Sequence, residues 1–369
     1  MSAEFGNHPT EVTLIGTGGG YGESTVMHIG NNNWIVVDSC VDPYTKKSLP
    51  LEYLRSKGVE TETQVKFIVC THWHDDHILG LSELLNHCSS AQLCMARAND
   101  KKKFVRAVGL DSSKISSDSS IASTLEFENC LEILGRRKGI IMEAFQDRLL
   151  FEVVSRESTA MLYSLSPSDH VSHQFDAEIA TLFEHAQRDR KVVLESPNSK
   201  SVVLLLKLND HNVILGADLE VSPDQNKGWL CILDNSLIAR KNKASLFKIP
   251  HHGSKNGYDE RIWRELLHEN PTTKLTPWNL GRGLPQKEMI YKFLEHTDKL
   301  FSTSKPRSKI KPKVRDSRIA KIIHEFNSTL AEVKYSYGAV RCTIDVTQPS
   351  PTWETELIGE ATKISPALF

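Results

Sequence analysis

Residues 71–77 read Thr-His-Trp-His-Asp-Asp-His and bring three histidines and two aspartates into one short segment. Imidazole nitrogens and carboxylate oxygens are the ligands that first-row transition metals prefer. His72 and His74 can face one metal ion. Asp76 and His77, which follow at once, can turn toward a second. The alternative interpretation is a chance cluster of polar surface residues.

The elements on either side of this segment favour the metal site. Residues 65–70 form a largely apolar run of strand length, and residues 78–85 begin an amphipathic helix. Side chains that directly follow a strand lie at an edge of its sheet, where metal sites are common. The same patterns predict further strands at residues 12–15, 25–29, 34–37, 201–208, 213–215 and 246–249, and helices at residues 125–134 and 287–296.

The chain resembles the metallo-β-lactamase superfamily, whose central motif, His-x-His-x-Asp-His, is matched at every fixed position by residues 72–77. Three more segments match in the family's order. Asp38 ends the strand at 34–37, where the family has a supporting acidic residue. Residues 216–218 read Gly-Ala-Asp, where the family has an aspartate that bridges two metals. Residues 250–254 read Pro-His-His-Gly-Ser, where the family places its last histidine ligand.

This resemblance implies an α/β fold, the four-layer αββα sandwich, with two divalent metal ions at one edge of the sheets. Zinc is the first choice of metal and manganese the second. Asp38 is expected to orient the histidines rather than bind metal. His252 is preferred to His251 as the last ligand, because the family's ligand stands just before glycine. The implied metal ligands are His72, His74, Asp76, His77, Asp218 and His252.

One segment departs from the family's pattern. Most members have a further histidine just before the strand that leads to the bridging aspartate, whereas residues 197–201 read Pro-Asn-Ser-Lys-Ser. The first metal site is therefore weak, or it is completed by Asn198 or by water. His170 is an alternative ligand from a nearby loop, and the other interpretation is that it is an ordinary polar residue.

Hydrolysis by a metal-bound hydroxide is the chemistry that the resemblance implies, since two metals about 3.5–4 Å apart lower the pKa of a shared water. Asp76 would hold the metal and the hydroxide, together with Asp218. His251 is a candidate general acid that protonates the leaving oxygen. The alternative is that His251 packs beneath the site.

Shorter matches favour a nuclease or another phosphodiesterase acting on DNA or RNA. Residues 20–24 (Gly-Tyr-Gly-Glu-Ser), 165–167 (Leu-Ser-Pro) and 251–254 (His-His-Gly-Ser) resemble the soluble nuclease-like domain of bacterial DNA-uptake (competence) channel proteins. Two alternatives stay open. One is a hydrolase of a small molecule such as a lactone, thioester or β-lactam, and the other is a catalytically weak, metal-stabilised binding module.

Charge supports a nucleic-acid partner only locally. The formal net charge is −1, so attraction to a polyanion must come from a patch. The stretch from Lys305 to Lys321 contains eight basic residues and a single acidic one, Asp316. Such a run can neutralise phosphates. The alternative is a solvated loop and helix face.

The expected organisation is a hydrolase domain over residues 10–304, with a mostly helical insertion around residues 99–158. Residues 305–369 then contain the basic stretch, a closing hairpin (residues 333–337 with 340–346) and a loosely ordered tail. The seven cysteines are scattered and include no Cys-x-x-Cys pair, which fits a reducing cytoplasm. A polar N-terminus and the lack of a long apolar run predict no membrane partner.

Overall fold

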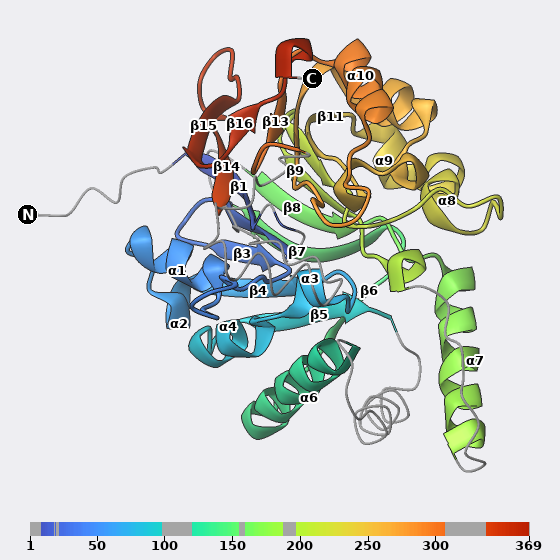
Figure 1. Ribbon diagram of the computed structural model, residues 1–369. Helices are drawn as coiled ribbons and strands as arrows, with labels where there is room; N and C mark the ends of the chain where they lie inside the picture. The colour runs from blue at the N-terminus through green and yellow to red at the C-terminus, as the bar shows by residue number, and fades with distance from the viewer. Residues whose placement is uncertain are drawn as a thin grey trace, which may run out of the picture.

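The computed structural model describes residues 9–17, 19, 22–97, 120–154, 159–186, 197–306 and 337–368. Within them the chain forms two eight-stranded mixed sheets that pack face to face, with helices on both outer faces (Figure 1). This is the predicted four-layer αββα sandwich.

The first sheet has the strand order β15-β14-β1-β2-β3-β4-β5-β6. Strands β3 to β6 run parallel to one another, and the rest of the sheet is antiparallel. Its strands are β1 (Thr10–Gly16), β2 (Glu23–His28), β3 (Trp34–Val37), β4 (Val65–Cys70), β5 (Gln92–Ala96), β6 (Met142–Ala144), β14 (Gly338–Ile344) and β15 (Glu354–Gly359).

The second sheet has the order β16-β13-β12-β11-β10-β9-β8-β7, with β10 to β13 parallel. Its strands are β7 (Arg148–Val154), β8 (Thr159–Ser164), β9 (Leu204–Leu208), β10 (Asn212–Leu215), β11 (Ala244–Lys248), β12 (Leu267–Leu275), β13 (Leu300–Ser302) and β16 (Thr362–Lys363). Strands β10 and β11 are short apolar runs buried on both faces, as parallel strands in a layered fold must be.

Helices cover the two sheets separately (Figure 1). The first sheet carries α1 (Leu49–Ser56), α2 (Thr61–Gln64), α4 (Leu81–His87) and α6 (Ser120–Arg137), and the second carries α8 (Gly228–Asn235), α9 (Leu237–Lys241) and α10 (Lys287–His296). The other helices are α3 (Asp75–Ile78), α7 (Asp169–Ala186), η1 (Pro197–Lys200), η2 (His251–Gly253), η3 (Lys255–Gly257), η4 (Ile262–Leu266) and η5 (Pro366–Leu368).

Three apolar clusters hold these layers together. One lies between the sheets and includes Phe67 and Leu204. Another packs α1, α4 and α6 onto the first sheet, and a third packs α8, η4 and α10 onto the second. The sheets are therefore clamped from both sides, and the loops at their edges are free to carry polar side chains.

Three local predictions differ from the structure. The strand at residues 340–346 does not pair with residues 333–337, because both of its edges are taken by β1 and β15. Only Tyr337 of that predicted partner belongs to the described residues. The tail after Pro349 is not loose either, since it supplies β15 and β16. The helix predicted at residues 78–85 is broken at Gly80, whose φ of 83° ends α3 before α4 begins.

The segment around residues 99–158 contributes strands as well as a helix. Among its described residues, α6 lies on the first sheet, while β6 and β7 are edge strands of the first and second sheets. The predicted domain boundary at residue 304 adjoins residues 307–336, which lie outside the described part of the chain, and it stays a prediction.

The described helices and the cysteines relate to the predictions about membranes and cellular location. No described helix is long and apolar enough to cross a membrane. All seven cysteines are buried and none is in a disulfide. The cytoplasmic location stays a prediction.

Candidate metal centre

Four parallel strands end at one edge of the sandwich, and each delivers polar residues there. Asp38 follows β3, the histidine segment follows β4, Asp218 follows β10 and His252 follows β11. The carboxyl ends of parallel strands commonly hold ligand sites in open α/β sheets. Residues as far apart in the sequence as Asp38 and His252 thus lie at the same edge of the sandwich.

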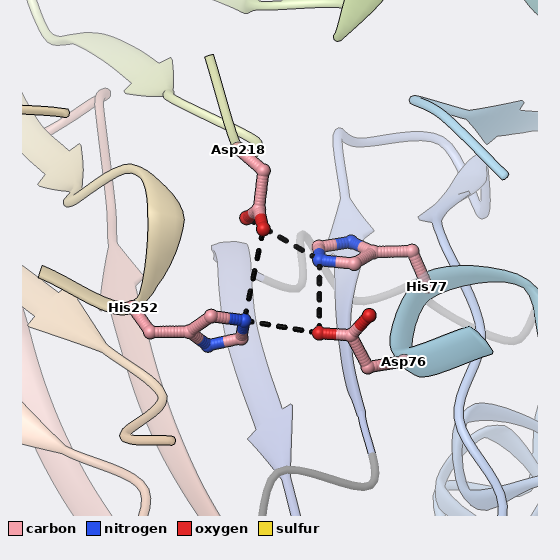
Figure 2. Close-up of side chains that lie close together, drawn as sticks. All are labelled: Asp76, His77, Asp218 and His252. Atoms are coloured by element: carbon pink, nitrogen blue, oxygen red, sulfur yellow. Dashed lines mark hydrogen bonds and ion pairs between the residues drawn. The ribbon is translucent and has the colours of Figure 1, made fainter. Parts of the chain in front are cut away.

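Asp76, His77, Asp218 and His252 form a compact buried cluster (Figure 2). One potential ligand atom from each lies within 4.8 Å of the others. The Nε2 atom of His252 is 3.0 Å from Oδ2 of Asp76, and Nε2 of His77 is 3.3 Å from Oδ1 of Asp218. This is the single such cluster that the described residues contain, and it unites four of the six predicted ligands.

Hydrogen bonds on the far side of each ring aim the Nε2 atoms at the centre. His77 contacts Oδ2 of Asp38 through Nδ1 at 2.8 Å, and His252 contacts the Thr276 carbonyl oxygen through Nδ1 at 3.0 Å. Asp38 is itself held by Thr71, which donates from its backbone N–H and its hydroxyl, each at 2.7 Å. The contact from Asp38 agrees with its expected supporting role, since such partners fix the ring orientation and the tautomer.

The two histidines and two aspartates of the cluster strongly shift one another's pKa values. Burial alone would lower the pKa of both histidines, but Asp218 and Asp76 raise the pKa of His77 well above its usual value and that of His252 to about 9. Burial likewise opposes ionisation of the two aspartates, yet His77 and His252 hold the pKa of each below its usual range. Without metal, protons on the histidines supply the positive charge that the carboxylates require.

His72 and His74 stand beside this cluster. The ring centroid of His72 is 4.3 Å from that of His77 and 4.9 Å from that of His74. Burial, and then the neighbouring His77, lowers the pKa of His72 well below its usual value. Burial also lowers the pKa of His74. Both rings are therefore neutral, which is the form that binds metal.

Asn198, His251 and Glu220 line the same edge where the family's missing histidine would stand. Oε1 of Glu220 lies 3.1 Å from Nδ1 of His251 and accepts a bond of 3.3 Å from Nδ2 of Asn198. Nδ2 of Asn198 is also 3.4 Å from Nε2 of His251. The hydrogen bond from His251 lowers the pKa of Glu220.

His170 is not brought to the cluster. It lies at the start of α7, where its Nε2 atom is 3.6 Å from the Asp224 carboxylate and its side chain is 43% exposed. Among the described residues, no histidine from another loop completes the first site in its place.

The donor set fits a divalent metal. Among the predicted ligands, three buried atoms make no hydrogen bond to the described residues, namely Nε2 of His72, Nε2 of His77 and Oδ1 of Asp218. The last two lie 3.3 Å apart as an ion pair. Leaving such atoms buried costs free energy unless something binds them. Histidine nitrogen with carboxylate oxygen suits zinc, and manganese is compatible with it. The ligand roles themselves stay predictions.

The sequence analysis missed three charged residues at this edge. Lys248, at the end of β11, contacts Glu23 at the start of β2, and both side chains are almost completely buried. Glu220 is the third, through its contact with His251. The signal in the sequence is a lysine at the end of an apolar strand, just before the Pro-His-His segment, because lysine is rarely buried unless it is paired. Its partner could not be predicted, because Glu23 comes from the other sheet.

The predicted basic stretch, residues 305–321, lies mostly outside the described residues. Lys305 is described and is exposed. Its carbonyl oxygen accepts a hydrogen bond of 3.4 Å from Nδ2 of Asn279.

Comparison with known proteins supports the family resemblance. A family model described as the metallo-beta-lactamase superfamily matches residues 17–263. No curated protein sequence matches the chain significantly. Solved structures that match parts of the chain include a HARLDQ-motif mutant of a Cronobacter sakazakii metallo-beta-lactamase, with 12% identity, 61% of this chain and 70% of that chain covered and a TM-score of 0.31. They also include the hydrolase AbOPH of the beta-lactamase superfamily (14%, 53% and 55%, 0.32) and MEM-A1, a subclass B3 metallo-beta-lactamase from a soil metagenome library (11%, 80% and 76%, 0.32). Similarity this low does not extend any neighbour's substrate to this chain.

Proposed function

The chain belongs to the metallo-β-lactamase superfamily, and from that premise we propose that it is a metal-dependent hydrolase that cleaves phosphodiester bonds in DNA or RNA. The reaction would take place at Asp76, His77, Asp218 and His252, with His72 and His74 alongside. Fold alone cannot select this substrate, because one superfamily hosts many chemistries.

One observation carries the choice of a polyanionic substrate: Lys305, the first residue of the basic stretch, is joined to the loop beside the metal centre. The ring centroid of Trp278 is 5.6 Å from that of His252. The next residue, Asn279, donates to the carbonyl oxygen of Lys305. Residues 307–321 lie outside the described part of the chain. A small neutral substrate has no need of such a run.

Divalent metals held by these histidines and aspartates would lower the pKa of a water and neutralise charge that develops on the substrate. The chain's own residues would do the rest. Asp38 and the Thr276 carbonyl keep His77 and His252 turned toward the centre. Asp76 and Asp218 bring the negative charge that draws cations to a buried edge.

His251 is placed to supply a proton to the leaving oxygen. Nδ1 of His251 faces the Glu220 carboxylate, which fixes the ring. Nε2 accepts from the Asn198 amide at 3.4 Å. When the ring is doubly protonated, Nε2 carries the proton that a substrate oxygen in place of the Asn198 amide would accept. This proton transfer is worth about 100- to 10,000-fold in typical enzymes.

A digestion panel tests the proposal. Purified protein would be analysed for bound metal and then offered single- and double-stranded DNA, RNA, a chromogenic phosphodiester, a lactone, a thioester and a β-lactam, with zinc or manganese added. Cleavage that needs metal and is lost in Asp76→Ala supports the proposal. Turnover only of lactones, thioesters or β-lactams would contradict it and identify a small-molecule hydrolase. Bound metal without turnover of any substrate would identify a binding module.

A further inference from the structure

The turn that carries Asp218 has an unusual backbone. Ala217 has a φ of 45°, in the left-handed region that residues with a β-carbon seldom adopt. The neighbouring glycine does not take this conformation. Gly216 is required for another reason, since a β-carbon there would lie 2.9 Å from the carbonyl oxygen of Lys248. The strained position in the turn therefore falls on alanine and must be held by its surroundings.

Lys248 holds this turn from two sides. Its ammonium nitrogen donates to the Ala217 carbonyl oxygen at 3.0 Å, and its own carbonyl oxygen accepts from the Gly216 N–H at 3.1 Å. The N–H of His251 also donates to the Ala217 carbonyl oxygen at 3.0 Å. The turn that precedes one predicted ligand is thereby joined to the turn that precedes another, His252.

The same ammonium group has two carboxylates beside it. It forms an ion pair with Oε1 of Glu23 and lies 3.9 Å from Oδ1 of Asp218. Glu23 comes from β2 of the first sheet, whereas Lys248 ends β11 of the second. The lysine side chain is only 3% exposed, so its ammonium group faces these carboxylates rather than solvent.

We propose that Lys248 is a positioning residue of the metal centre: its ammonium group holds the left-handed turn at Ala217 and so aims Asp218 at the metal, with Glu23 as its counter-ion. Its ammonium group would act on the metal through Asp218, which lies 3.9 Å away. The inference rests on the metal centre of the proposed function and is independent of the substrate.

Metal affinity of purified protein, measured by competition with a chromophoric chelator, tests this role without any assay of turnover. Lys248→Met alone leaves the buried Glu23 carboxylate with only the His77 ring, 3.9 Å away, so the informative variant is the double change Glu23→Gln with Lys248→Met, compared with Glu23→Gln alone. We expect its dissociation constant for zinc or manganese to rise roughly 10- to 100-fold, the usual cost of losing a residue that supports a metal ligand. Lys274→Met, which removes the neighbouring buried lysine, should leave the constant unchanged.

Wild-type affinity in the double variant would overturn the proposal, because Lys248 would then only neutralise Glu23. Absence of metal binding in the wild type would instead overturn the proposed function itself.

Adding Ala217→Gly to the double variant gives a second readout. Glycine adopts the left-handed conformation without strain, so the turn should need less support from Lys248. We expect the glycine change to recover at least several-fold of the lost affinity, and to alter the wild-type affinity by no more than about twofold. No recovery would mean that charge alone explains the effect of Lys248, and would overturn its role in the turn.

Discussion

Lys248 and Lys274 occupy paired positions on the neighbouring parallel strands β11 and β12, and both are buried. Their surroundings differ completely. Lys248 lies at the metal-centre edge against Glu23 and Asp218, which raise its pKa although burial opposes this. Lys274 lies between the sheets, where its ammonium group donates to the carbonyl oxygens of Val12 and Val340.

Burial lowers the pKa of Lys274, and Cys342 and Glu11 offset only part of this effect. Neighbouring carboxylates thus offset the cost of burying the charge on Lys248. On Lys274, one strand away, that cost is offset only in part. Counter-ions, rather than burial alone, therefore determine whether the charged form of a buried lysine is favoured in this fold.

Removing an anion from the metal-centre edge should have the largest effect. Asp76→Ala deletes a predicted metal ligand whose carboxylate contacts His252 and His77. We expect hydrolysis below roughly 1% of wild type, since losing even a supporting partner of a metal ligand costs about 10- to 100-fold. Turnover of a chromogenic phosphodiester measures this. The thermal unfolding profile should remain cooperative, and a variant that fails to fold would contradict a purely catalytic role.

Exchanging each lysine for methionine tests the comparison directly. Lys248→Met strands the buried carboxylate of Glu23 and should lower the free energy of unfolding of the metal-free protein by about 3–5 kcal/mol. Lys274→Met strands no carboxylate and should change it by no more than about 1 kcal/mol. Urea unfolding monitored by tryptophan fluorescence gives both values.

The companion change Glu23→Gln should restore most of the stability lost in Lys248→Met. Equal losses for the two single lysine variants would break the comparison, because counter-ions would then have no special weight.

Charge in the basic stretch should behave differently from that of either buried lysine. Reversing several charges in residues 305–321 should weaken nucleic-acid binding for all sequences. Each lost phosphate contact should flatten the log–log salt dependence by about 0.7–0.9. Hydrolysis of a small chromogenic phosphodiester should be unaffected, because that substrate reaches only the metal centre. Affinity measured against salt concentration tests this, and identical slopes would identify the stretch as a solvated face.

Alkaline pH offers the smallest and most specific test of Lys274. Between its lowered pKa and the usual 10.5, the unfolded chain binds a proton that the folded protein does not, so wild-type stability should gain as the pH rises through this range. Lys274→Met has no such proton. The stability difference should therefore move in favour of the wild type over this range. A constant difference across that range would contradict the lowered pKa.

The sequence predicted those parts of the site whose residues lie close together along the chain. Residues 72–77 lie in one segment, and an apolar strand leads into them, so the ligand types and the sheet edge both followed from pattern. Asp218 and His252 followed from the family's order of motifs. The contact between Lys248 and Glu23 could not be predicted, because it joins two sheets and depends on their relative placement.

The closing strand shows the same limit. Pattern placed a strand near residues 340–346, but only the fold determines that β1 and β15 are its neighbours. A hairpin with the preceding residues was the simplest local choice, and long-range pairing overrode it. Alternation of apolar residues reports which face is buried and carries no information about a strand's partner.

That pairing also sets the order of events during synthesis. Strand β1 cannot pair with β14 until β14 has been synthesised. The ion pair between Glu11 and Arg341, which joins the two strands, spans 330 residues. At about 5–20 residues per second, a ribosome needs roughly 15–70 s to deliver the partner strand. Through that interval one edge of the first sheet is open to pairing with other chains. Until its final strands emerge, a newly made chain therefore presents this unpaired strand edge to its neighbours.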